Sequence, residues 1–119
     1  MNRHEERAHV AIVDYLGVVA PDLLVFHPAN GGLRSKAEAR RLKAMGVLAG
    51  IPDLVLVAPG GRVFFVEIKS RRGCLSPAQQ AIRMRMIRLG IPCITARSID
   101  DVRLALCQWG LQTREARAA

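Results

Sequence analysis

Two apolar runs rich in β-branched residues, joined by a short glycine-containing segment, constrain the fold of this chain more than any other feature. The runs span residues 51–57 and 62–69, and residues 58–61 connect them with the sequence Ala-Pro-Gly-Gly. Runs of this kind, separated by a few turn residues, are typical of a β-hairpin. If the turn centres on Gly60, residues at equal distances on either side of it face each other. The sequence therefore predicts an antiparallel hairpin with a defined register.

Two acidic residues, Asp53 and Glu67, interrupt the apolar strands of this hairpin. The predicted register places them directly opposite each other on one face, about 5 Å apart. Carboxylates this close repel each other, so the pKa of one should rise unless a cation lies between them. A divalent ion that prefers oxygen ligands, Mg²⁺ or Mn²⁺, would remove this conflict. Strand alternation places Lys69 beyond Glu67 on the same face.

Two carboxylates, a lysine and a metal ion are the groups needed to hydrolyse a phosphodiester. The metal lowers the pKa of bound water and neutralises phosphate charge, while the lysine positions the water or stabilises the developing negative charge. The alternative is that Asp53 caps the turn after Pro52, with Glu67 and Lys69 paired on a solvated face. The opposed Asp53 and the basic chain favour the catalytic interpretation, which a register shift of one residue would remove.

Helical and extended patterns alternate along the rest of the chain, which predicts a single α/β domain. Helices are expected over residues 4–19, 35–45 and 76–89 and from Ser98 onward, and short strands over residues 23–26 and 91–95. We expect the domain to span residues 1–110 and residues 111–119 to form a frayed tail. In the first helix, the apolar residues that share one face are Ala8, Ile12, Leu16 and Val19. Glu5 and His9 lie on that same stripe, whereas Glu6 points elsewhere.

The charge of the chain indicates a polyanionic partner. Lys and Arg number 18 against 10 Asp and Glu, a formal net charge of +8. Such an excess is typical of proteins that bind nucleic acid or an anionic membrane, although it also serves solubility. No apolar run approaches the ~20 residues that span a bilayer, and no signal peptide is visible. The three cysteines are widely spaced and lack zinc-ligand partners, so we expect reduced thiols in a cytoplasmic protein.

Several motifs follow one another in a fixed order. They are HPANGG at residues 27–32, the basic segment 34–46, GIPDL at 50–54, VEIK at 66–69 and LSPAQ at 75–79. This set resembles the VRR-NUC (virus-type replication-repair nuclease) branch of the PD-(D/E)XK superfamily, over nearly the whole chain to about Leu106. The resemblance implies a restriction-endonuclease-like core of order αβββαβ, with a mixed sheet flanked by helices.

The resemblance also implies an active site. Asp53 and Glu67 would bind Mg²⁺ or Mn²⁺ with the backbone carbonyl of Ile68. Lys69, Gln79 and an acid of the first helix would complete the site; Glu5 matches that acid best, with Glu6 as the reserve.

Some of these positions have other interpretations. The family often has Gln four positions after the first-helix acid, where this chain has His9. Gln79 also suits an exposed first helical turn, and Asn30 suits a turn before glycine. His27 is equally typical of a packed histidine at the end of a strand, and we do not expect it to be a catalytic base.

Basic residues gather in the second helix and just after the second hairpin strand. There they could contact phosphates without reading sequence. The candidate DNA-binding residues are Asn30, Arg34, Lys36, Arg40, Arg71 and Arg72. Aromatic residues are scarce, so duplex or branched DNA is expected in preference to stacked single strands.

Stand-alone members of this family resemble homodimers that act on four-way DNA junctions, and larger relatives act on flaps in DNA repair. By this resemblance we expect a homodimeric, metal-dependent, structure-selective DNA endonuclease. Its substrates would be four-way (Holliday) junctions or other branched DNA, in a bacterial or phage-infected cell. The alternatives are a non-catalytic DNA-binding module with a nuclease fold, and a nuclease directed to flaps or RNA.

Overall fold

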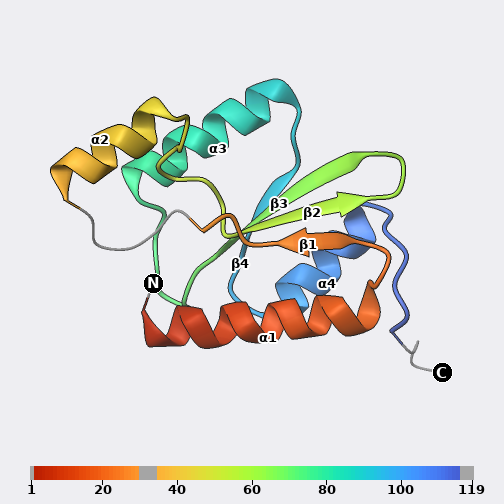
Figure 1. Ribbon diagram of the computed structural model, residues 1–119. Helices are drawn as coiled ribbons and strands as arrows, with labels where there is room; N and C mark the ends of the chain where they lie inside the picture. The colour runs from red at the N-terminus through yellow and green to blue at the C-terminus, as the bar shows by residue number, and fades with distance from the viewer. Residues whose placement is uncertain (1, 30–34, 116–119) are drawn as a thin grey trace.

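The computed structural model describes residues 2–29 and 35–115 of the chain (Figure 1). Its elements are, in order, α1 (Arg3–Val19), β1 (Leu24–Phe26), α2 (Lys36–Ala44), β2 (Leu54–Ala58), β3 (Arg62–Ile68), α3 (Pro77–Leu89), β4 (Cys93–Ala96) and α4 (Ile99–Gln108). Each helix and strand expected from the sequence is present. The predicted α/β class, with a mixed sheet flanked by helices, is confirmed.

The four strands form one sheet in the order β1-β2-β3-β4. The β1–β2 and β2–β3 pairs are antiparallel, whereas β3 and β4 are parallel. Parallel neighbours need a crossover connection, and α3 supplies it. The sheet order follows the chain order, and α3 connects β3 to β4 at the edge of the sheet.

The hairpin has the register that the sequence predicts: Leu54 pairs with Val66, and Ala58 pairs with Arg62. One boundary differs, because we expected the strand to begin at residue 51 and β2 begins at Leu54. Pro52 has no N–H to donate, so the regular ladder cannot continue through it. Asp53 therefore lies immediately before the strand and not within it.

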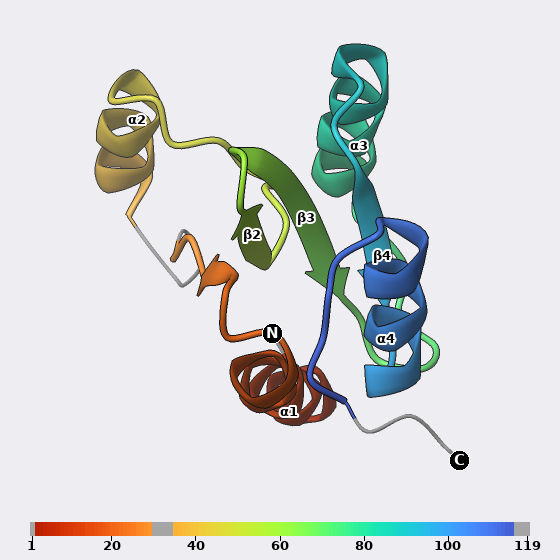
Figure 2. The same ribbon diagram turned by 90° about the vertical axis from the view of Figure 1, so that its right-hand side faces the viewer.

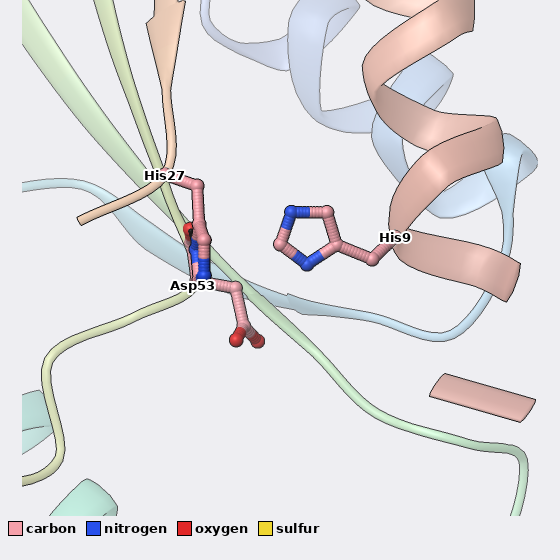
Figure 3. Close-up of side chains that lie close together, drawn as sticks. All are labelled: His9, His27 and Asp53. Atoms are coloured by element: carbon pink, nitrogen blue, oxygen red, sulfur yellow. Dashed lines mark hydrogen bonds between the residues drawn. The ribbon is translucent and has the colours of Figure 1, made fainter. Parts of the chain in front are cut away.

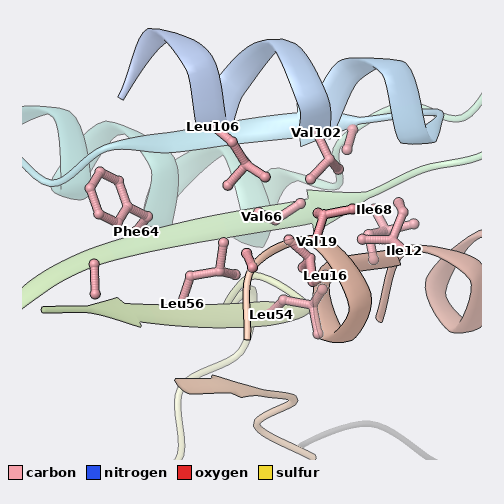
Figure 4. Packing of buried hydrophobic residues seen from close by; sticks show 13 residues of the cluster. Ile12, Leu16, Val19, Leu54, Leu56, Phe64, Val66, Ile68, Val102 and Leu106 are labelled. Atoms are coloured by element: carbon pink, nitrogen blue, oxygen red, sulfur yellow. The ribbon is translucent and has the colours of Figure 1, made fainter. Parts of the chain in front are cut away.

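The hydrophobic core lies between the sheet, α1 and α4 (Figure 4). Alternate residues of β2 and β3, including Leu54, Phe64 and Val66, point into it and are almost fully buried. The face of α1 predicted from its helical spacing is confirmed, since Ile12 and Leu16 have no exposed surface. Burial of a side chain of this size contributes about 1.5–3 kcal/mol, so this layer fixes α1 against the sheet.

The end of the chain corrects one expectation. Residues 111–115 are not frayed: the Arg114 N–H donates to the Val19 carbonyl at 2.6 Å. The Glu115 carboxylate accepts hydrogen bonds from the Tyr15 hydroxyl at 2.8 Å and the Arg103 Nε at 2.7 Å. This segment is therefore held against α1 and α4, and residues 116–119 lie outside the described residues.

Among the helices of residues 2–29 and 35–115, none combines the length and apolar character needed to cross a bilayer.

Candidate active site

The side chains that sequence reasoning selected gather at one end of the sheet. Figure 1 shows that the start of α1, the end of β3 and the start of α3 lie at this end. Continued beyond the Leu54–Val66 pair, the register sets Asp53 opposite Glu67 and Pro52 opposite Ile68. The hairpin therefore brings the two carboxylates together, as its sequence predicts.

Asp53 takes over a backbone hydrogen bond at the end of β3. The N–H groups of Phe65 and Lys69 donate to the β4 side, so the N–H of Ile68 faces the β2 side. It donates to Oδ2 of Asp53 at 2.7 Å. The Ile68 carbonyl points to the same side, where Pro52 has no N–H to offer it. A backbone oxygen that lacks a ladder donor is thus placed beside the Asp53 carboxylate.

Glu67 is a buried carboxyl group. It is 3% exposed and projects from the face opposite to its core-facing neighbours Val66 and Ile68. Burial, followed by the hydrogen bond to Asp53 and the negative charge of Asp53, raises the pKa of Glu67 to about 8. The positive charges of Lys69 and Arg83 act in the opposite direction. Without a cation between the two side chains, the Glu67 carboxyl group therefore holds a proton near neutral pH.

This donor set fits a divalent metal ion. Asp53, Glu67 and the Ile68 carbonyl present oxygen atoms, the ligands that Mg²⁺ and Mn²⁺ prefer. A bound ion would replace the proton of Glu67 and allow this carboxyl group to ionise. The residues present are therefore of the kind that could hold such an ion.

Gln79 connects α3 to the carboxylates. Ser76 is the N-cap of α3, and its hydroxyl accepts from the Gln79 N–H, while Oε1 of Gln79 accepts from the Ser76 N–H at 2.8 Å. Nε2 of Gln79 donates to Oε1 of Glu67 at 3.1 Å. One side chain therefore completes a capping box and also orients Glu67. Pro77 is the first residue of the helix, a position where its missing N–H costs no helical hydrogen bond.

The two acids of the first helix lie differently. Glu5 is half-buried, and its Oε1 accepts from the Ser70 N–H at 3.4 Å, just beyond β3. Glu6 is exposed and lies beside Arg3 and Arg7 on the outer surface of α1. Glu5 is thus the acid directed to the strand that holds Glu67 and Lys69.

The candidate DNA-binding residues occupy two places. Lys36 and Arg40 are exposed on α2, and Arg71 and Arg72 are exposed in the segment after β3. Asn30 and Arg34 lie outside the described residues. No residue of α2 is buried, and Figure 2 shows this helix set apart from the other three. The described cations therefore lie on two separate exposed segments of the chain.

Three positioned groups were missed by sequence reasoning. Arg83 is half-buried one helical turn after Gln79, where its charge acts on Glu67. Nη1 of Arg97 donates to the carbonyls of Ser70 and Gly73, both at 2.7 Å, so it holds the segment that carries Arg71 and Arg72. The spacing of Gln79 and Arg83 on one helical face could have revealed Arg83. Nothing in the local sequence marks Arg97.

The third group is a pair of histidines. The rings of His9 and His27 meet edge to face, with centroids 4.7 Å apart, and lie beside Asp53 (Figure 3). Burial and the charge of His27 lower the pKa of His9, and the charge of Asp53 partly opposes this. The pairing of β1 with β2 brings His27 to Asp53, and the inward stripe of α1 brings His9. The sequence placed His9 on the inward stripe of the first helix and His27 at the end of a strand, but it did not indicate that the two rings meet.

Comparisons with known proteins agree with this geometry. The model of the VRR-NUC domain matches residues 32–100. A solved structure described as a VRR_NUC domain is 22% identical, with a TM-score of 0.63, and the match covers 90% of this chain and 97% of that one. A solved VRR_NUC domain protein is 23% identical, with a TM-score of 0.70, and the match covers 92% and 89%. At these identities the two structures show a shared fold. None of the curated proteins compared with the sequence matches it.

Proposed function

This chain belongs to the VRR-NUC domain family, and we propose that it is a metal-dependent, structure-selective DNA endonuclease. Family membership gives it a nuclease-type fold for processing DNA. The observation that supports catalysis best is the buried Glu67 opposite Asp53, with Lys69 and Gln79 beside it. A fold kept only for DNA binding gains nothing from burying an acidic side chain against a second one.

Each residue of the site has a role in this proposal. Asp53, Glu67 and the Ile68 carbonyl would hold Mg²⁺ or Mn²⁺, which when bound lowers the pKa of water and neutralises phosphate charge. Lys69 orients the attacking water and stabilises negative charge on the phosphate. Gln79 fixes the Glu67 carboxylate through the hydrogen bond from its Nε2. Glu5 supplies a further carboxylate near the end of β3.

The proposed substrate is branched DNA, with the four-way junction first. Lys36 and Arg40 on α2 and Arg71 and Arg72 after β3 would contact phosphates on either side of the site, which requires no base recognition. We propose a homodimer, because a two-fold axis would present two sites to the paired strands of a junction. The rival functions are a DNA-binding module without catalysis, and a nuclease for flaps or RNA.

The experiment is cleavage of labelled four-way junction, flap and linear duplex DNA with Mg²⁺ or Mn²⁺. Lys69→Ala and Asp53→Ala should abolish cutting, whereas Asp22→Ala, which removes an exposed acid of the α1–β1 turn, should cut like the wild type. Tight junction binding without cleavage under either metal would overturn the enzyme proposal. RNA copies of the same substrates distinguish an RNA-directed nuclease, and light scattering of the free protein tests the dimer.

A further inference from the structure

Three side chains from separate elements meet beside the carboxylate pair. His9 comes from α1, His27 follows β1 and Asp53 precedes β2, and their ligand atoms all lie within 4.8 Å of one another (Figure 3). Figure 3 shows the His9 ring and the Asp53 carboxylate directed toward the same space. The ligand atoms of one bound ion lie about 3–4 Å apart. These three side chains would therefore have to move about 1 Å closer together to bind one ion.

His27 is held in an arrangement that suits a metal ligand. Its Nδ1 lies 2.6 Å from the backbone carbonyl oxygen of Asp53. A carbonyl can only accept, so Nδ1 carries the proton and donates it, which leaves the lone pair on Nε2. Metal-binding histidines use their second nitrogen in this way, and the bond fixes both the tautomer and the ring orientation.

The ring nitrogens of His9 have a different environment. Within residues 2–29 and 35–115 they form no hydrogen bond, although the ring is half-buried and touches His27 edge to face. A ring held by packing alone leaves its nitrogen available to an ion.

We propose that His9, His27 and Asp53 form a binding site for a divalent transition-metal ion, with Mn²⁺, Co²⁺ and Zn²⁺ as the ions it would take. Two imidazoles and one carboxylate suit these ions, whereas Mg²⁺ selects oxygen ligands and retains its waters. The site shares Asp53 with the proposed nuclease centre, and to that extent it rests on the proposed function. It would place two imidazole nitrogen ligands next to a centre whose proposed ligands are all oxygen atoms.

The first test titrates Co²⁺ into the full chain and follows its visible absorption. The background carries Cys74→Ser and Cys107→Ser, because exposed thiols also bind Co²⁺. His9→Gln and His27→Asn should each weaken the Kd about tenfold or more, as expected when a ligand is lost. His4→Asn is the matched control, since His4 is exposed and is the remaining histidine of the chain, and it should leave the Kd unchanged. Equal Kd values in all three variants would overturn the proposal.

A second measurement needs no variant at the site. The chain has three histidines, so an imidazole NMR spectrum contains three ring systems. Stoichiometric Zn²⁺ should shift the rings of His9 and His27 and leave His4 in place. Uniform shifts, or none, would show that the histidine pair is only a packing contact.

These readouts separate the two proposals. If His9→Gln and His27→Asn lose Co²⁺ affinity but neither the wild type nor any variant cuts DNA, the metal site stands and the nuclease proposal fails. If Mg²⁺-dependent cutting persists and Co²⁺ affinity is unaffected by the histidine variants, the nuclease stands and the histidine site fails.

Discussion

Helices α2 and α3 have similar charge but contribute to this molecule in different ways. Each contains several Arg or Lys residues and begins with a serine N-cap. α3 buries Ile82 and Met86 and donates from Gln79 to Glu67, whereas no residue of α2 is buried. The comparison indicates that α3 is part of the machinery that orients the carboxylates. α2 presents its cations on the surface and buries no residue, so contact with DNA is its proposed role.

Two glycines allow a direct test of this difference. Gly50 and Gly46 both have positive φ, 87° and 97°. A Cβ on Gly50 would collide with the Ala78 carbonyl and lie 2.8 Å from the Gln79 nitrogen, at the start of α3. A Cβ on Gly46, just after α2, would meet nothing within 4 Å.

We expect Gly50→Ala to have the largest effect. It must displace the start of α3 or the segment leading to Asp53, so it should cost roughly 3 kcal/mol or more and abolish cleavage. Gly46→Ala should cost only the penalty for placing an alanine at positive φ, about 1–2 kcal/mol. Chemical denaturation of both variants measures the difference. Equal losses of stability would show that the contact between residue 50 and α3 does not hold the site together.

The second prediction concerns the two glutamines of the first turn of α3. Gln79→Ala removes both the capping box and the hydrogen bond to Glu67, so it should cost about 1 kcal/mol and lower kcat about tenfold or more. Gln80 is exposed, and its side chain donates to the Leu75 carbonyl and not to Glu67 in the described part of the chain. Gln80→Ala should therefore keep kcat within about twofold of wild type.

Unfolding curves and single-turnover cleavage distinguish the two roles of Gln79. If Gln79→Ala lowers stability but leaves kcat unchanged, its amide acts only as a helix cap. Gln79→Glu should retain the cap but lose the donor to Glu67, so its kcat should remain low.

Much of this site follows from local sequence rules. The strand alternation and the Gly60 turn fix the register, and the register alone brings Asp53 opposite Glu67. The start of β2 was predicted less accurately than the register. The apolar run extends back to Ile51, but Pro52 ends the hydrogen-bonded ladder, so the strand begins at Leu54.

Long-range contacts were beyond those rules. His27 reaches Asp53 only because β1 pairs with β2, and Arg97 reaches Ser70 from beyond β4. The order of residues 111–115 depends on Glu115, which meets Tyr15 across the fold. Periodicity carries information on which face a residue occupies, whereas these contacts depend on how separate elements pack.

The smallest structural effect is expected on α2, where the comparison predicts a change in binding without a change in stability. Lys36→Ala with Arg40→Ala removes two exposed cations from a helix that buries nothing. The Tm should stay within about 1 °C of wild type, because exposed substitutions of this kind are close to neutral. Affinity for junction DNA should fall about tenfold, and the slope of log K against log salt should decrease by about two.

Arg88→Ala, at the far end of α3, is the matched control and should leave the slope unchanged. If the α2 variant instead lowers Tm with an unchanged salt slope, α2 contributes to the fold and its cations do not contact phosphate. An unchanged Tm with a reduced slope would show that these two cations contact phosphate and do not contribute to the stability of the free protein.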